Sequence, residues 1–276
     1  MKYTFLRFPA FRSKAVTLSY DDGVAYDRKL IEIMRANGLR GTFNINGGRF
    51  AAEPNQHRLT KEDALALYTE SGMEVAVHGL KHLSLGEVDP AMATRDVLED
   101  RLCLEQLFGK IIKGMAYANG SFDDRVVEIL KNCGMEYART TRSTETFLLP
   151  SDWLRLDPTC HHKNPRLMEL AKEFAELSPP NYYWSDYPRL FYLWGHSYEF
   201  NNDDNWSVIE EFAQYIGNRE EIWYATNGEL YDYVKAYEAL RFSADGKTIH
   251  NPTAQTLWLN VCGTLCKVEA GETVRI

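Results

Sequence analysis

Short apolar runs alternate along the chain with longer segments in which apolar residues recur every three or four positions. The run AVTLSY, at residues 15–20, has the β-branched and aromatic content of a buried strand. The next segment, AYDRKLIEIMRANG at residues 25–38, has the spacing of an amphipathic helix, and Gly38 stands where such a helix ends. The pattern predicts a strand followed by a helix.

This strand-helix alternation continues to residue 242. Thr60 and Asp89 stand at the predicted starts of two helices, where their side chains can accept backbone N–H groups. Repeated strand-helix units predict parallel strands joined by crossover helices, in a barrel or in an open doubly wound sheet. The further predicted strands cover residues 40–45, 73–78, 112–118, 135–140, 189–196 and 221–226, and the further predicted helices cover residues 60–72, 90–108, 121–134, 205–218 and 227–242.

Two segments depart from this alternation. Residues 142–189 are rich in proline and aromatic residues without a regular period, which predicts an irregular functional excursion. Residues 246–276 alternate with a period of two between turn signals, which predicts a small antiparallel β appendage. We therefore expect a main domain at residues 1–241 and the appendage at residues 242–276, packed on the main domain.

Composition narrows the classes of partner. The chain has 276 residues, a net charge of −8 at pH 7 and a pI near 5.5, which disfavours nucleic acid and anionic membranes. The N-terminus lacks the unbroken apolar region of a signal peptide, and no run approaches the roughly 18 apolar residues of a membrane span. Five cysteines without paired spacing predict free thiols, so we expect a cytoplasmic protein.

Titratable residues gather where predicted strands end. Asp21 and Asp22 follow the first strand, and His78 and His196 end two later strands. The sequence Asp-Asp-Gly is also good turn chemistry, but turns alone do not explain three such strand ends. Because α/β domains bind ligands at the carboxyl ends of their strands, we expect these side chains to form one site.

The spacing of His78 and His82 favours a metal site. In one helical turn the two imidazoles face the same way, and a carboxylate from another strand end completes a three-ligand face with room for water and substrate. One of the adjacent carboxylates can bind the cation while the other stays nearby as an uncoordinated base. The pair of aspartates therefore fits a metal site better than it fits a core.

Other histidines and aromatic residues give weaker signals. His161 and His162 are expected in a surface loop, with contact to substrate or to a second cation as the alternative. Tyr182, Tyr183 and Trp184 form either a wall on which a sugar ring stacks or part of the core or of a lid.

Four segments in this order, TLSYDDG, VHGLKH, MAYANGSFDD and LFYLWGHSYEF, resemble the motifs of the polysaccharide deacetylase family. This family is also called the NodB-homology group or carbohydrate esterase family four. The resemblance covers residues 16–225 and is greatest for a divergent bacterial branch. It implies an irregular (β/α) barrel of seven strands that holds a divalent cation and removes acetyl groups from N-acetylated sugars.

The resemblance also implies roles for individual residues. Asp21 is the general base and His196 is the general acid. The metal ligands are Asp22, His78 and His82, and the metal is expected to be zinc, with cobalt and nickel as alternatives. A backbone N–H in the loop after Tyr117 is expected to hold the oxyanion. The expected substrate-binding residues are Tyr117, Asn119, Arg139, Trp184 and Trp194.

The third motif departs from the family pattern. The segment MAYANG lacks the arginine and the proline of the usual Arg-x-Pro-Tyr/Phe-Gly, in which the arginine orients the catalytic aspartate. Arg139, at the end of the next predicted strand, is a candidate replacement. The aspartate that usually tunes the catalytic histidine has two candidate equivalents, Asp157 and Glu199.

The predicted function is metal-dependent hydrolysis of an acetyl group from an N-acetylated or O-acetylated sugar or polysaccharide, with an aspartate base and a histidine acid. One alternative is a carbohydrate-binding or regulatory protein that keeps the metal without turnover. Another is a deacylase of a small amide that is not a polysaccharide. A non-haem iron oxygenase shares the two-histidine, one-carboxylate face, but the helix-rich pattern disfavours it.

Overall fold

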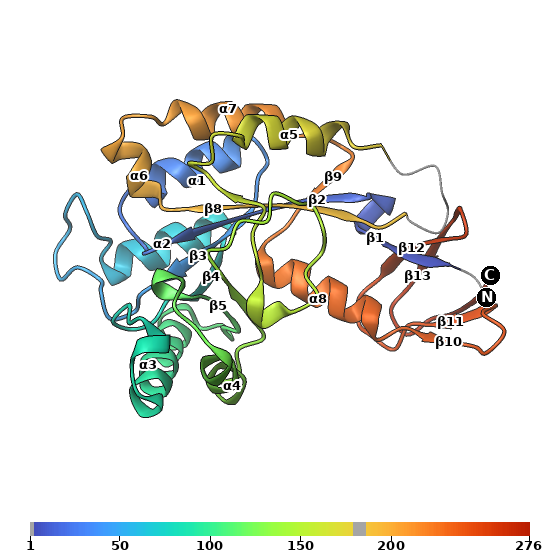
Figure 1. Ribbon diagram of the computed structural model, residues 1–276, viewed down its shortest axis with the longest axis horizontal. Coiled ribbons are helices and arrows are strands. Elements are labelled where there is room, and N and C mark those ends of the chain that lie inside the picture. The colour runs from blue at the N-terminus through green and yellow to red at the C-terminus, as the bar shows by residue number, and fades with distance from the viewer. Residues whose placement is uncertain (1–2, 179–185) are drawn as a thin grey trace.

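A curled parallel sheet forms the centre of the computed structural model, which describes residues 3–178 and 186–276 (Figure 1). Its strands follow the order β6-β5-β4-β3-β2-β8-β7, and β9 also pairs with β2, beside the start of that strand. Neighbouring strands of this sheet are parallel, which confirms the predicted seven-stranded (β/α) barrel architecture. The strands are β2 (Lys14–Asp21), β3 (Gly41–Ile45), β4 (Glu74–Val77), β5 (Gly114–Ala116), β6 (Tyr137–Arg139), β7 (Cys160–His161), β8 (Arg189–Gly195) and β9 (Ile222–Tyr224).

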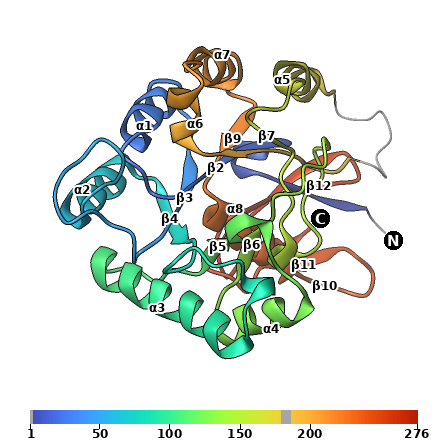
Figure 2. The same ribbon diagram turned by 60° about the vertical axis from the view of Figure 1, so that its left-hand side comes forward.

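Helices surround this sheet in an arc, which is clearest in Figure 2. They bury one apolar face each against the strands, as in α4, where Val126, Val127 and Leu130 are at most 3 % exposed. The α-helices are α1 (Asp27–Ala36), α2 (Lys61–Ser71), α3 (Pro90–Phe108), α4 (Asp124–Asn132), α5 (Leu167–Glu176), α6 (Ser197–Asn202), α7 (Ser207–Ile216) and α8 (Asn227–Glu238). Short 3-10 turns cover Pro9–Phe11, Leu85–Glu87, Ala118–Gly120 and Trp153–Arg155.

The predicted helix starts are confirmed by their caps. The side chain of Thr60 accepts the backbone N–H of Asp63, and that of Asp89 accepts the N–H groups of Ala91 and Met92. These caps mark the starts of α2 and α3. The position of α3 matters because this helix contacts the loops of the candidate site from outside the barrel.

The prediction of irregular structure throughout residues 142–189 is wrong at α5. Leu167, Leu170, Ala171 and Phe174 are at most 3 % exposed and face the sheet. Their spacing of three and four residues is itself a helix signal, which the surrounding prolines and aromatic residues concealed.

The amino end of α8 closes the barrel at the amino ends of its strands. Asn227 lies in the barrel interior, where it accepts the hydroxyl of Thr17 at 2.9 Å and donates to the hydroxyl of Tyr192 at 2.6 Å. Its backbone N–H donates to the hydroxyl of Thr42 at 2.9 Å. These polar pairs fill the barrel interior beside Asn227, and the carboxyl ends of the strands lie at the opposite end.

The C-terminal residues form two small antiparallel sheets, as their alternation predicts. One has the order β10-β11-β14, and the other has the order β1-β12-β13. The second sheet includes β1 from the opposite end of the chain, which the sequence pattern did not indicate, and Figure 1 shows both termini on this side. The domain boundary at residue 241 stays a prediction. These strands are β1 (Thr4–Arg7), β10 (Arg241–Phe242), β11 (Thr248–His250), β12 (Leu257–Val261), β13 (Thr264–Val268) and β14 (Thr273–Arg275).

Within the described residues, no helix has the length and apolar character needed to cross a membrane. All five cysteines are free thiols, as their spacing predicts.

Candidate active site

Three predicted metal ligands meet at the carboxyl end of the sheet. Asp22 follows β2, and His78 and His82 follow β4. Asp22 Oδ1 lies 3.6 Å from His82 Nε2 and 4.0 Å from His78 Nε2. One ligand atom from each residue lies within 4.8 Å of the other two. These distances bring together one carboxylate and two imidazoles, a donor set that suits zinc and its neighbours.

The two histidines approach each other through a loop, so the predicted helical turn between them is wrong. Gly79 has φ of 81° and His82 has φ of 61°, and the ring centroids of His78 and His82 are 4.8 Å apart. A side chain at Gly79 would place Cβ 2.4 Å from Asp96 Oδ2, so the close approach of α3 also requires glycine. The left-handed residues turn the loop back on itself and bring the imidazoles together.

Hydrogen bonding fixes the orientation of the His78 ring. Its Nδ1 lies 2.9 Å from the carbonyl oxygen of Ala116, at the end of β5. Because a carbonyl only accepts, Nδ1 carries the proton and Nε2 presents its lone pair towards Asp22. Asp22 Oδ1 is buried and has no hydrogen-bond partner. An unpartnered carboxylate oxygen facing an unprotonated ring nitrogen fits a cation between them.

The backbone at Asp22 explains how neighbouring carboxylates reach one site. Asp21 still belongs to β2, but Asp22 has φ of 80°, in the left-handed region. Successive residues of a strand point to opposite faces, and this turn brings the second carboxylate back. Asp21 Oδ2 therefore lies 3.8 Å from the same His78 Nε2 that Asp22 approaches.

Asp21 is 2 % exposed and fully ionised at neutral pH. Burial alone raises the pKa of this carboxyl, but opposing charges, of which the Arg139 guanidinium is the largest, outweigh burial and lower the pKa to about 2. Its Oδ2 forms an ion pair with Arg139, and its Oδ1 accepts the side-chain amide of Asn44 at 2.8 Å.

Arg139, the last residue of β6, is fully buried beside Asp21. Its guanidinium carbon lies 4.2 Å from the ring centroid of Trp194, and one nitrogen donates to the carbonyl oxygen of Thr140 at 3.1 Å. The arginine predicted to replace that of the third motif therefore lies against the expected base, although it comes from a different strand. Trp194 stacks on this arginine and is 8 % exposed.

His196 follows β8 and faces Asp21 from the other side. Its Nδ1 lies 3.0 Å from Glu199 Oε2, and its Nε2 lies 3.9 Å from Asp21 Oδ2. Burial alone lowers the pKa of His196, but the hydrogen bond to Glu199 and the charges of Asp21 and Glu199 raise it above its ordinary value. Of the two candidate partners, Glu199 contacts His196, whereas Asp157 bonds to Thr140 and Arg142.

The prediction of a surface loop is wrong for His162, which is 2 % exposed, and His161 ends β7. His161 Nε2 lies 3.2 Å from Glu199 Oε2, so by distance His161, His196 and Glu199 are also a group that a cation could join. However, His161 Nδ1 accepts the backbone N–H of Lys163 at 3.1 Å, so Nε2 keeps its proton and donates it to Glu199. This group is a hydrogen-bonded cluster around one carboxylate.

The remaining predicted substrate residues lie in different surroundings. Tyr117 is 1 % exposed, donates its hydroxyl to the carbonyl oxygen of Leu154 and stacks on Phe122, so its ring does not line the site. Asn119 is exposed and donates to the hydroxyl of Ser84 at 3.0 Å. Tyr182, Tyr183 and Trp184 lie outside the described residues.

Sequence reasoning missed several polar residues beneath the site. Asn44 and Asn46 lie at the end of β3, and Asp96 and Asp100 lie on the buried face of α3. A signal was present, because polar residues at a strand end and two aspartates four apart among buried helix positions are both unusual in a core.

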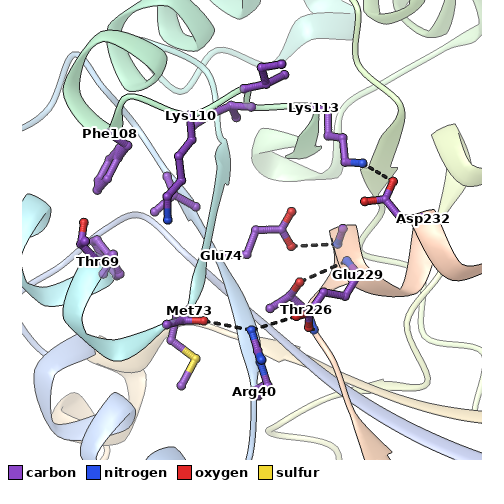
Figure 3. A pocket seen from close by; sticks show the side chains of 16 residues that line it. Arg40, Thr69, Met73, Glu74, Phe108, Lys110, Lys113, Thr226, Glu229 and Asp232 are labelled. Atoms are coloured by element: carbon purple, nitrogen blue, oxygen red, sulfur yellow. Dashed lines mark hydrogen bonds and ion pairs between the residues drawn. The ribbon is translucent and has the colours of Figure 1, made fainter. Parts of the chain in front are cut away.

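A cavity of about 270 Å³ lies at the other end of the barrel (Figure 3). Two ion pairs line it, Arg40 with Glu229 and Lys113 with Asp232. Glu74, the first residue of β4, accepts hydrogen bonds from Thr42, Tyr137 and Gly228. The amino ends of barrel strands support stability and the carboxyl ends support chemistry, so the candidate active site is the cluster around Asp21.

The fold and this cluster define an α/β-barrel protein with carboxylates and imidazoles gathered at the carboxyl ends of its strands. Residues 9–138 match the model of the polysaccharide deacetylase family. The match confirms the resemblance that the motifs indicate. It includes Asp21, Asp22, His78 and His82 and ends before Arg139 and His196. No curated protein sequence matches the chain.

Solved structures share the fold at low sequence identity. A proposed polysaccharide deacetylase from Mycobacterium smegmatis has a TM-score of 0.58 and 14% identity, covering 86% of this chain and 96% of its own. A family 4 carbohydrate esterase from Streptomyces lividans, in complex with acetate, has a TM-score of 0.52 and 15% identity, covering 76% and 90%. A family 4 pseudoenzyme from Bacillus anthracis has a TM-score of 0.50 and 15% identity, covering 83% and 68%.

Proposed function

We infer that the chain is a metal-dependent hydrolase that removes acetyl groups from N-acetylated or O-acetylated sugars. The family match over residues 9–138 supports the class of reaction, and the Streptomyces lividans esterase of similar fold was solved with acetate, the product of such a reaction. The observation that carries the proposal is the position of Asp21 Oδ2, which lies 3.8 Å from His78 Nε2 and 3.9 Å from His196 Nε2.

Asp22, His78 and His82 are the proposed ligands of a divalent cation, zinc first, with cobalt and nickel as alternatives. The unpartnered oxygen of Asp22 and the oriented Nε2 of His78 support this assignment. When bound, such a cation acidifies water and polarises an acyl carbonyl. The ionised Asp21, held beside these ligands but paired with Arg139, is the proposed acceptor of the proton from that water.

His196 is the proposed proton donor to the leaving group. An amide nitrogen leaves poorly until it is protonated, so the donor must be charged near neutral pH. The hydrogen bond from Nδ1 to Glu199 keeps Nε2 turned towards Asp21, and the same carboxylate raises the pKa of the ring. Glu199 therefore acts on the reaction through the orientation and charge of His196.

Acetate release tests the proposal. Protein loaded with zinc, cobalt or nickel is expected to release acetate from N-acetylglucosamine oligomers or from an O-acetylated glycan, and metal-free protein is expected to release none. Release from small acetylated amides alone would instead support a small-molecule deacylase.

A carbohydrate-binding protein without turnover is the second candidate. The observation that favours it is the segment MAYANG, which lacks the usual arginine and proline, and a Bacillus anthracis pseudoenzyme shares the fold. Stoichiometric metal together with glycan binding and no acetate from any acetylated sugar would establish this alternative.

His78→Ala is expected to lower bound metal from one equivalent to none, because it removes a ligand that Ala116 holds in place. Elemental analysis of dialysed protein measures the change. His250→Ala, which removes an imidazole of β11 in the C-terminal sheet, is the control and should keep one equivalent. Full metal content in His78→Ala would exclude this ligand assignment.

Glu199→Gln is expected to lower the pKa of His196, because the carboxylate that stabilises the charged ring is removed. A general acid is active while protonated, so the loss of kcat/KM with rising pH should begin at lower pH in this variant. A pH-rate profile and an NMR titration of His196 measure the shift. Asp157 does not contact His196, so Asp157→Asn is the control and should keep the wild-type profile. An unchanged profile in Glu199→Gln would show that Glu199 does not set the pKa of His196.

A further inference from the structure

Two carboxylates on α3 hold the loop that carries both metal-site histidines. Asp100 accepts the backbone N–H of His78 at 3.0 Å through Oδ2 and that of Gly47 at 2.5 Å through Oδ1. Asp96, one helical turn earlier, accepts the backbone N–H of Lys81 at 2.9 Å. Together they fix the loop at its start, at His78, and just before its end, at Lys81.

A third side chain bonds to carbonyl oxygens of the same loop. Asn46, just after β3, donates its amide to the carbonyl oxygens of His78 at 2.9 Å and of Gly79 at 2.7 Å. The backbone of His78 is thus bonded at its N–H by Asp100 and at its carbonyl by Asn46. Its ring is bonded separately by Ala116, so both the backbone and the side chain of this ligand are held.

Core packing does not account for these carboxylates. Asp100 is fully buried and Asp96 is 4 % exposed, on the same helix face as the buried Val97 and Leu104. A carboxylate in such a position costs free energy unless its oxygens are well bonded, and an apolar residue would pack there without that cost. Their bonds lead to the loops after β3 and β4, which points to a task at those loops.

We propose that Asp100 and Asp96 are positioning residues that preorganise His78 and His82 for the cation and thereby set the metal affinity of the site. The proposal rests on the proposed function for the presence of a cation. Residues that hold a metal ligand from outside its coordination sphere typically contribute about 10–100-fold in affinity. Without Asp100, the N–H of Gly47 loses its buried acceptor and the N–H of His78 keeps only the carbonyl oxygen of Ile45, at 3.1 Å, so the loop can relax away from Asp22.

The dissociation constant for zinc, measured on the full chain by competition with a chelator, tests the proposal. Asp100→Ala is expected to weaken zinc binding by about 10–100-fold, and Asp96→Ala by a smaller factor. Glu99→Gln is the matched control, because it neutralises a carboxylate on the same helix whose side chain is 43 % exposed and pairs with Arg95. It should bind zinc as the wild type does.

A merely structural role gives a different result. It would lower the free energy of unfolding of the metal-free protein and leave the zinc dissociation constant of the folded fraction unchanged. Unchanged zinc affinity in folded Asp96→Ala and Asp100→Ala therefore overturns the proposal. If Asp100→Ala does not fold, Asp96→Ala alone decides. Failure of the proposed metal site itself looks different, because the wild type would then bind zinc no better than His78→Ala.

Discussion

Asp21→Asn is expected to keep the bound cation and to lose at least about 100-fold in turnover. The amide has nearly the shape of the carboxylate but cannot take a proton from water. Asn44, which now donates to Asp21, has an unpartnered amide oxygen and can reverse its amide to fit the new side chain. The new side chain should therefore fit, although the buried Arg139 loses its counter-charge and the fold loses stability. Turnover is measured on folded, metal-loaded protein, where the loss should fall on the chemical step.

Acetate release at saturating metal, with elemental analysis of the same sample, measures both parts of this result. Asp157→Asn is the control, because it neutralises a carboxylate bonded to Thr140 and Arg142 without contact to Asp21. Unchanged turnover in Asp21→Asn would remove this residue from the mechanism. Loss of the metal together with turnover would make Asp21 a ligand instead of a free base.

Arg139→Leu is expected to lower the free energy of unfolding at pH 7 by about 3–5 kcal/mol, because breaking a buried ion pair leaves one charge uncompensated. Asp21 is 2 % exposed and would have no cation beside it in the metal-free protein except the neighbouring histidines. The Trp194 ring would also lose its stacked guanidinium.

The pH dependence gives this prediction a second readout. In the wild type, the pKa of Asp21 falls from its ordinary 3.8 to about 2, so the pair stabilises the fold above about pH 4 and this contribution is lost as pH falls towards 2. In Arg139→Leu the pKa of Asp21 should rise, so the variant should be weakest relative to the wild type at neutral pH and recover at acid pH.

Urea unfolding of the metal-free proteins measures these differences. The double variant Asp21→Asn with Arg139→Leu should recover part of the lost stability, because neither charge remains buried. Arg142→Leu removes an arginine whose side chain is 76 % exposed and should cost less than about 1 kcal/mol. A loss below 1 kcal/mol in Arg139→Leu as well would show that the ion pair does not support the fold.

The barrel was predictable because its signals are local. The strand-helix alternation, the caps at Thr60 and Asp89 and the carboxylates after β2 all lie within a few residues of the element that they mark. α5 was missed although its apolar spacing is regular, because neighbouring prolines and aromatic residues outweighed a signal of only ten residues. Local signals predict elements well when no stronger local signal competes.

The candidate site was predictable only in part. That Asp21, Asp22, His78 and His196 lie together follows from the strand-end rule, since parallel strands bring their carboxyl ends to one edge. The partners of these residues did not follow. Arg139 was one candidate, Glu199 was one of two, and Asp96 and Asp100 were not considered. Each contact depends on which side chain a separate element turns inwards.

The sequence by itself therefore determined which residues are candidates for chemistry and at which end of the barrel they lie, because strand order along the chain and side-chain type are properties of short segments. The tertiary structure alone decided how those residues are held. Left-handed backbone at Asp22 and His82 turns both side chains towards His78. Side chains from β6, α3 and α6 contact Asp21, the backbone of His78 and the ring of His196. Such pairings join residues up to 118 positions apart, and only the packing of the whole barrel brings them within hydrogen-bond distance.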